Sequence, residues 1–259
     1  MFANRILQYY QQLRGPANLP SQVEVLNPYQ NEYTLALCQQ FYNKYYLDDK
    51  PRKILFGINP GRLGAGLTGI PFTDPVMLSD RCNIANKLNQ RVEISSRFIY
   101  DMIYSYGGPK TFYAKYYISA LSPLGYVSNR VNLNYYDLPN YKNLFESYIV
   151  TQIQKQLSLN IDRSVAYSIG KGKNYDFLCY LNKKHYFFVI VFQTSQNVPK
   201  RSRRSKTTKN MKTSQTSQKI KKSIFEIGKP PIFIFSIFYW VSYFSWTLGF
   251  SWFSPRWPG

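Results

Sequence analysis

The residues with the clearest capacity for chemistry lie in one stretch, 57–72, which reads GINPGRLGAGLTGIPF. Its glycines let the main chain approach a ligand closely and turn with positive φ. A phosphate-binding P-loop would end in Gly-Lys-Ser/Thr, and no lysine follows Gly66. A dinucleotide fingerprint would read GxGxxG, whereas the order here is Gly61-x-x-Gly64-x-Gly66. These two phosphate sites are excluded, and a purely structural loop stays as the alternative to a binding site.

The elements around this stretch predict how it is held. Strands are predicted at 52–58, 115–120, 164–169 and 186–192, and helices at 3–13, 31–46, 95–106, 141–159 and 174–184, with Asn31 as the cap of the second helix. Residues 59–75 are predicted as a loop, and Gly107-Gly108-Pro109 as a helix end. Strands that alternate with helices indicate an α/β fold with a parallel sheet covered on both faces. Because ligands bind at the carboxyl ends of such strands, we expect the loops at Asn59, Ser122 and Lys171 to share one edge.

Residues 57–72 closely resemble the first motif of the single-strand-selective monofunctional uracil-DNA glycosylases, within the uracil-DNA glycosylase superfamily. That motif runs G-x-N-P-G, a short glycine-containing segment, and T-G-x-P-F, and the spacing from Asn59 to Phe72 matches without a gap. Weaker resemblance extends over residues 1–192, nearest to the bacterial branch. The resemblance implies a three-layer α/β/α sandwich around a short parallel sheet. It also implies a base-excision repair enzyme that hydrolyses uracil or modified uracil from DNA without metal or cofactor.

The resemblance assigns roles by position. It implies that Asn59 is the catalytic residue that orients the attacking water, and that Phe72 stacks on the flipped base. The remaining residues expected around the base are Gly57, Ile58, Pro60, Gly61, Leu63 and Ala120, and those expected to bind DNA are Arg62, Ser122, Pro123, Lys171 and Lys173. At Ala120 the sequence departs from the family, whose members often carry an Asn there that reads the pyrimidine edge. A base must leave the duplex to reach such a site, and aromatic stacking is worth roughly 1–3 kcal/mol.

Charge and cysteine content agree with this reading. The formal net charge is +20, of which residues 1–192 carry +9 and residues 193–259 carry +11. A basic surface is what phosphate binding needs. Cys38, Cys82 and Cys179 are far apart and His185 is the only histidine, so neither a metal site nor a disulfide framework is predicted. No signal peptide is evident at the N-terminus. We expect a monomer in the bacterial cytoplasm, associated with the nucleoid.

The end of the chain departs from the family. Its late H-P-x-R type motif, whose histidine stabilises the departing base, is not found, and His185 is predicted to be a surface or boundary residue. We divide the chain into a glycosylase-like domain at 1–192, a basic disordered segment at 193–230 and an apolar aromatic tail at 231–259. Residues 193–196 are Gln-Thr-Ser-Gln, and some choices of codons for them, read with the frame shifted by one base, encode a basic residue followed by His-Pro-Arg. The hypothesis is that residues from about 189 onward are translated out of frame.

Two other functions compete with catalysis. Without the late histidine, the chain could be a catalytically inactive DNA-binding protein. Alternatively, residues 232–253 are apolar and long enough to span a bilayer, and the basic segment 200–222 precedes them. That reading would make a membrane-anchored protein. We favour the enzyme and expect no membrane partner.

Overall fold

The computed structural model describes residues 1–170 and 172–194. The predictions for residues 195–259, including the candidate bilayer span at 232–253, lie outside the described residues, and so does Lys171. In the part that is described, no helix has both the length and the apolar character needed to cross a membrane.

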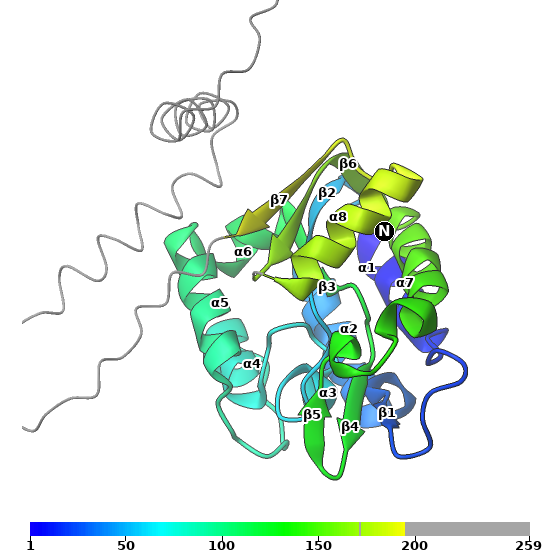
Figure 1. Cartoon of the computed structure of the whole chain (residues 1–259). Helices are drawn as coiled ribbons and strands as arrows, with labels where there is room; N and C mark the ends of the chain where they lie inside the picture. Colours follow the sequence, from blue (N-terminus) through cyan, green and yellow to red (C-terminus); the bar gives the residue numbers. More distant parts are fainter. Residues whose placement is uncertain (171, 195–259) are drawn as a thin grey trace, which may run out of the picture. The chain divides into compact units, whose positions relative to one another are not determined.

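A four-stranded parallel sheet forms the centre of the fold (Figure 1). Its strands are β2 (Arg52–Gly57), β3 (Tyr116–Ala120), β6 (Ile161–Ile169) and β7 (Ile190–Thr194), in the order β3-β2-β6-β7. Every neighbouring pair is parallel, which confirms the predicted sheet. The last strand begins at Ile190 instead of Tyr186, because the Asn182 side chain bonds the main-chain N–H and C=O of Phe188 at 2.8 and 3.1 Å. Those bonds hold the preceding residues in a separate connection.

Helices cover both faces of this sheet. They are α1 (Phe2–Gln11), α2 (Glu32–Tyr45), α3 (Ala65–Thr68), α4 (Pro75–Cys82), α5 (Ile94–Ser105), α6 (Gly108–Tyr113), α7 (Tyr141–Leu157) and α8 (Lys173–His185), with short 3-10 turns η1 (Pro28–Gln30) and η2 (Tyr135–Asp137). Neighbouring residues of β3 point to opposite layers, because strand side chains alternate. The Tyr117 hydroxyl lies 3.0 Å from that of Tyr10 in α1, whereas the Tyr116 ring stacks on Phe112 of α6 at 4.9 Å. The three-layer α/β/α sandwich is therefore correct.

The predicted helices are present, with boundaries shifted by a few residues, and Asn31 caps α2 by accepting a hydrogen bond from the Thr34 N–H at 3.0 Å. The expected loop at 59–75 was wrong in part, because it contains α3 and leads into α4. Asp74 caps α4 by accepting from the Met77 N–H at 2.8 Å, and Pro75 occupies the first turn, where its fixed φ suits a helix. The segment Gly107-Gly108-Pro109 follows the end of α5, as predicted, and it also starts a further helix, because α6 begins at Gly108.

A small antiparallel sheet was not predicted. It contains β1 (Glu24–Leu26), β4 (Gly125–Ser128) and β5 (Val131–Leu133), in the order β1-β4-β5. Asn129 and Arg130, both with positive φ, turn the chain between β4 and β5. The sheet packs directly on the motif loop, because a Cβ at Gly125 would lie 2.6 Å from the Pro60 carbonyl oxygen. The hairpin of β4 and β5 leads directly into η2, which lies at the carboxyl edge of the main sheet.

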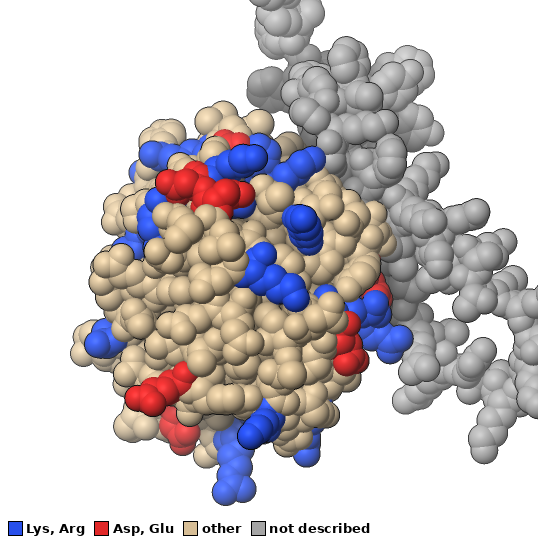
Figure 2. All heavy atoms as spheres, turned by 180° about the vertical axis from the view of Figure 1, so that it is seen from behind, with Lys and Arg blue, Asp and Glu red and all other residues tan. Residues whose placement is uncertain are grey.

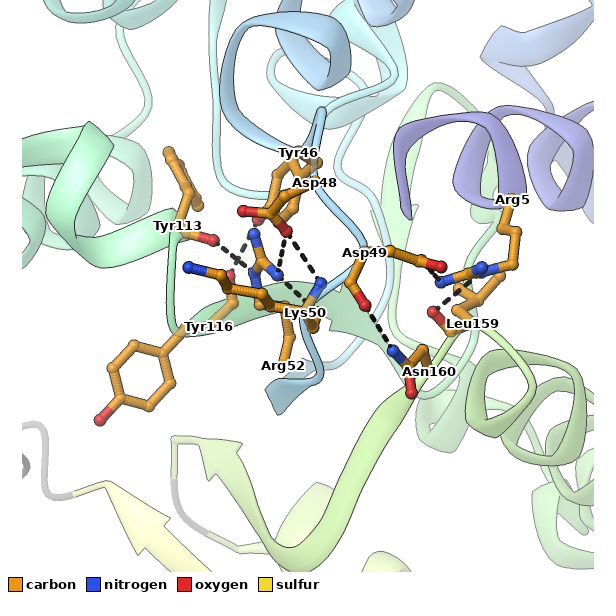
Figure 3. A network of polar contacts seen from close by, with 10 residues as sticks. All are labelled: Arg5, Tyr46, Asp48, Asp49, Lys50, Arg52, Tyr113, Tyr116, Leu159 and Asn160. Atoms are coloured by element: carbon orange, nitrogen blue, oxygen red, sulfur yellow. Dashed lines mark hydrogen bonds and ion pairs between the residues drawn. The ribbon is translucent and has the colours of Figure 1, made fainter. Parts of the chain in front are cut away.

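The amino edge of the main sheet is tied by a buried guanidinium (Figure 3). Arg52, the first residue of β2, is fully buried. Its Nε donates to the Tyr113 carbonyl at 2.9 Å, and its Nη1 donates to Asp48 Oδ1 at 2.7 Å and to the Lys50 carbonyl. The Tyr46 ring lies 5.6 Å from the guanidinium carbon, a cation–π arrangement. These contacts fix β2 at the end opposite to the motif loop.

Candidate active site

A cavity of about 300 Å³ opens at the carboxyl edge of the main sheet. Gly57, Ala120 and Ile169, the last residues of β2, β3 and β6, all line it. Its other lining residues are Tyr10, Tyr29, Ile58, Asn59, Pro60, Gly61, Ala65, Pro71, Phe72, Glu93, Ser95, Ser119, Pro123, Asn134 and Gly170. The volume is at the lower end of the range for small-molecule sites. The edge predicted from the strand–helix alternation is therefore the place where a cavity forms.

The Asn59 side chain is held by three main-chain groups. Its Nδ2 donates to the Leu133 carbonyl at 3.0 Å and to the Pro60 carbonyl at 3.3 Å. Its Oδ1 accepts the Tyr135 N–H at 3.0 Å. Since these partners fix which end of the amide is oxygen, the side chain cannot rotate without breaking bonds. One lone pair of Oδ1 stays available for a further donor, such as a water molecule.

Phe72 is held over the end of β2. Its φ is +53°, in the left-handed region, which is uncommon for a bulky residue. The ring lies so close to Gly57 that a Cβ there would come within 2.6 Å of Phe72 Cε2. The half-buried ring also lines the cavity. A glycine at 57 and a strained main chain at 72 therefore place an aromatic face beside Asn59's loop.

The glycines of the motif loop allow a tight turn. The Gly61 carbonyl accepts hydrogen bonds from the N–H groups of Gly64 and Gly66 at 3.3 and 2.8 Å. A Cβ at Gly66 would lie 2.6 Å from that carbonyl oxygen, so a side chain there would disrupt the turn. The turn brings main chain, rather than side chains, to the wall formed by Pro60 and Gly61.

The opposite wall comes from the end of β3. The N–H groups of Leu121 and Ser122 donate to the carbonyls of Gly57 and Ile58, both at 3.1 Å, which extends the strand pairing past Ala120. Ala120, which stands at the predicted base-reading position, has only a methyl group to offer. Ser119 and Pro123 line the cavity beside it.

The residues predicted to bind DNA are less closely grouped. Of these, Pro123 lines the cavity, whereas Arg62, Ser122 and Lys173 do not, and nor does Leu63 from the base-binding set. Arg62 and Lys173 are exposed, so they remain available to phosphates. The Ser122 side chain is fully buried and its hydroxyl lies 2.7 Å from that of Tyr126, so it is occupied within the fold.

The structure adds residues that the sequence did not indicate. Glu93 and Ser95, at the start of α5, line the cavity, as do Ser119 and Asn134. Tyr135 contributes through its main-chain N–H alone, so its residue type gave no signal. Glu93 is half-buried, and burial together with the nearby Asp74 carboxylate raises its pKa. Of these missed residues, only Ser119 could have been found from the sequence, because it directly precedes Ala120 in the predicted strand.

His185, the only histidine of the chain, lies away from the cavity. It occupies the last turn of α8, half-buried, with its ring stacked on Phe187 at 5.3 Å. This is the boundary position that was predicted. Among residues 1–170 and 172–194, no three His, Cys, Asp or Glu side chains are grouped as metal ligands would be.

The surface turned away from the view of Figure 1 carries Lys and Arg side chains scattered among uncharged residues, with a few acidic ones between them (Figure 2). Basic residues on that side are not gathered into one patch.

Comparison with known proteins gives a specific relative. No family model matches the chain, and no curated protein matches it. The crystal structure of wild-type SMUG2 from Pedobacter heparinus is similar, with a TM-score of 0.72 and 39% sequence identity. The match covers 74% of this chain and 85% of that chain.

Proposed function

Because this chain belongs to the SMUG2-like single-strand-selective monofunctional uracil-DNA glycosylases, we propose that its cavity binds a flipped uracil or modified uracil and hydrolyses its N-glycosidic bond in DNA. The observation that best supports this proposal is that Asn59 and Phe72 line the same cavity, together with the main chain of Gly57 and Gly61. These are the two residues to which the motif assigns water positioning and base stacking.

The fixed amide of Asn59 suits a positioning role. With Oδ1 bonded to the Tyr135 N–H, its remaining lone pair accepts one hydrogen bond from the attacking water. The water oxygen bonds to the sugar C1′, and the electron pair of the glycosidic bond leaves with the base. The water gives up a proton to the solvent, and the released base anion takes one up from it. Since an amide is a poor base, holding the water is its main contribution, and the departing anion needs a separate stabilising group.

Base release from uracil-containing oligonucleotides tests this proposal. Released base leaves alkali-labile abasic sites, which are read as strand cleavage after hot alkali. Asn59→Ala is expected to abolish that cleavage. Asn89→Ala, which alters an exposed residue outside the cavity, serves as the matched control and keeps activity. Equal activity in Asn59→Ala and the control would overturn the catalytic assignment.

We further propose that this chain is impaired, because the late histidine motif is missing from it. Support comes from the end of β7, where Thr194 pairs with Ile169 and the Gln193 side chain donates to the Gly170 carbonyl at 3.3 Å. Both partners line the cavity. In the proposed alternative reading frame a histidine falls at position 194, and its imidazole would stand at this edge. The nucleotide sequence across codons 188–200 tests the idea, and a neighbouring frame without His-Pro-Arg would contradict it.

An inactive DNA-binding protein is the second candidate, favoured by the position of His185 outside the cavity. It predicts that uracil DNA is bound without base release. The glycosylase-like domain at 1–192, with DNA as its partner, is common to both candidates, and we propose that it acts as a monomer near the nucleoid.

A further inference from the structure

The cavity holds a carboxyl group that the proposed reaction does not use. Glu93 is the only carboxyl among the described residues that line it. The amide of Asn59 is engaged by Leu133, Pro60 and Tyr135, and the side chain of Ala120 offers no polar atom. A base buried here would leave its polar edge unpaired unless another side chain met it, and unpaired buried groups are costly.

The position of Glu93 is determined by contacts from three segments. Its main-chain N–H donates to Asp74 Oδ2 at 2.8 Å, and Asp74 is itself fully buried at the start of α4. Its carboxyl lies against the motif loop, since a Cβ at Gly61 would come within 2.9 Å of Glu93 Oε1. A Cβ at Gly64 would clash with Oε2. The glycines at 61 and 64 therefore make room for this carboxyl, as Gly57 does for Phe72.

The surroundings of Glu93 favour its neutral form. Burial raises its pKa, and so does the carboxylate of Asp74, whereas bonds from Ser95 and the Gly64 main chain oppose the shift. The motif loop presents only the main chain of its glycines at this contact, and Arg62 beside them is exposed. A departing base that carries negative charge would favour the neutral carboxyl further.

We propose that Glu93 binds the base edge, with its neutral carboxyl donating its O–H to a ring carbonyl of uracil and accepting the neighbouring N3–H. A carboxylic acid presents a donor and an acceptor side by side, which matches the adjacent N–H and C=O of the ring. This inference rests on the proposed function, because it requires a uracil-type base in the cavity. It makes Glu93 the residue that pairs with the base edge in a chain where position 120, which often holds an edge-reading Asn in the family, is alanine.

Equilibrium binding to uncleavable DNA tests the proposal. The probes are one single-stranded oligonucleotide with a 2′-fluoro-2′-deoxyuridine and the same strand with a tetrahydrofuran abasic site. The ratio of their dissociation constants isolates the contribution of the base. Glu93→Ala is expected to reduce this ratio by on the order of tenfold to a hundredfold, as the loss of two hydrogen bonds predicts. Glu93→Gln keeps a donor beside an acceptor and is expected to retain the ratio within about threefold.

The pH dependence and a control variant separate this role from a structural one. The ratio for the wild type falls as pH rises through the pKa of Glu93, whereas the ratio for Glu93→Gln stays flat. Glu24→Gln removes the same charge from an exposed position outside the cavity and leaves the ratio unchanged. Thermal melting of each variant checks folding.

The outcomes distinguish the two proposals. A wild type that does not prefer the uracil strand over the abasic strand contradicts the proposed function itself. A wild type that prefers it, with Glu93→Ala unchanged, overturns the role of Glu93 alone. If Glu93→Gln is as weak as Glu93→Ala and the wild-type ratio rises with pH, the group acts as a carboxylate and the neutral pairing is wrong.

Discussion

The ring of Phe72 occupies the space that a side chain at Gly57 would need, with Cε2 and Cζ at 2.6 and 2.9 Å from the Cβ of a residue there. Gly57→Ala is therefore expected to displace the ring and to weaken binding of uracil-containing single strands. Overpacking of this kind costs about 1–3 kcal/mol of folding stability. Base stacking contributes a similar amount to binding, so Phe72→Ala should weaken it by about tenfold to a hundredfold.

A double-mutant cycle checks this link. If Gly57→Ala acts through the ring, it adds little to the binding defect of Phe72→Ala, and the two effects are non-additive. Independent, additive losses would mean that Gly57 affects the cavity by another route. Fluorescence anisotropy with the uncleavable strand supplies all four dissociation constants.

Asn59→Asp is expected to destabilise the fold at neutral pH. The carboxylate cannot donate to the Leu133 carbonyl, which lies 3.0 Å from the present Nδ2. Loss of such a bond with an unpaired acceptor left behind costs about 1–3 kcal/mol. Urea denaturation measures the loss, and Asn89→Asp, at an exposed position, is the control. Equal midpoints for the two variants would show that the bond to Leu133 does not hold Asn59 in solution.

Asp162 gives an acid-dependent contribution to stability. Burial alone would raise the pKa of its carboxyl, but hydrogen bonds from Lys53 and Ser164 outweigh that effect and lower it from 3.8 to about 2. The fold thus favours the ionised form. Its contribution is complete above about pH 4, the ordinary pKa of an aspartate, and is lost as pH falls to about 2. We expect the difference in melting temperature between the wild type and Asp162→Asn to shrink across that window. A difference that persists unchanged at pH 2 would exclude this linkage.

The missing late histidine can be supplied. The combined substitutions Gln193→Lys, Thr194→His, Ser195→Pro and Gln196→Arg introduce the basic-His-Pro-Arg sequence that is proposed for the next reading frame. Removing one preorganised donor from an active site typically costs about 10²–10³ in rate, so restoring one should raise single-turnover base release by at least about tenfold. The same substitutions without Thr194→His are the control. No difference between the two variants would indicate that position 194 does not serve the departing base.

The main sheet and the site edge followed from the sequence because both rest on local patterns. Strand–helix alternation predicted the parallel sheet, and the glycine-rich segment after β2 marked the carboxyl edge. The β4–β5 hairpin was missed because its strands span three to four residues and its turn, Asn129-Arg130, contains no glycine.

Glu93 was missed for a different reason. Its place in the cavity depends on Asp74, nineteen residues earlier in the chain, and on space left by Gly61 and Gly64. Such pairings are set by tertiary packing and leave no periodic signal in one sequence. The role of Tyr135 is equally hidden, because only its main chain takes part.

The bond from the Tyr135 N–H to Asn59 Oδ1 also makes this amide proton a reporter. In hydrogen–deuterium exchange without substrate, the protection of this amide proton measures how often its hydrogen bond to the Asn59 side chain breaks. The NMR resonance of the Tyr135 amide would therefore report whether the Asn59 side chain stays in place as temperature changes, in variants and when DNA is bound. Slow exchange there, beside fast exchange in the exposed turn at Asn129, would show a site already ordered before the base arrives.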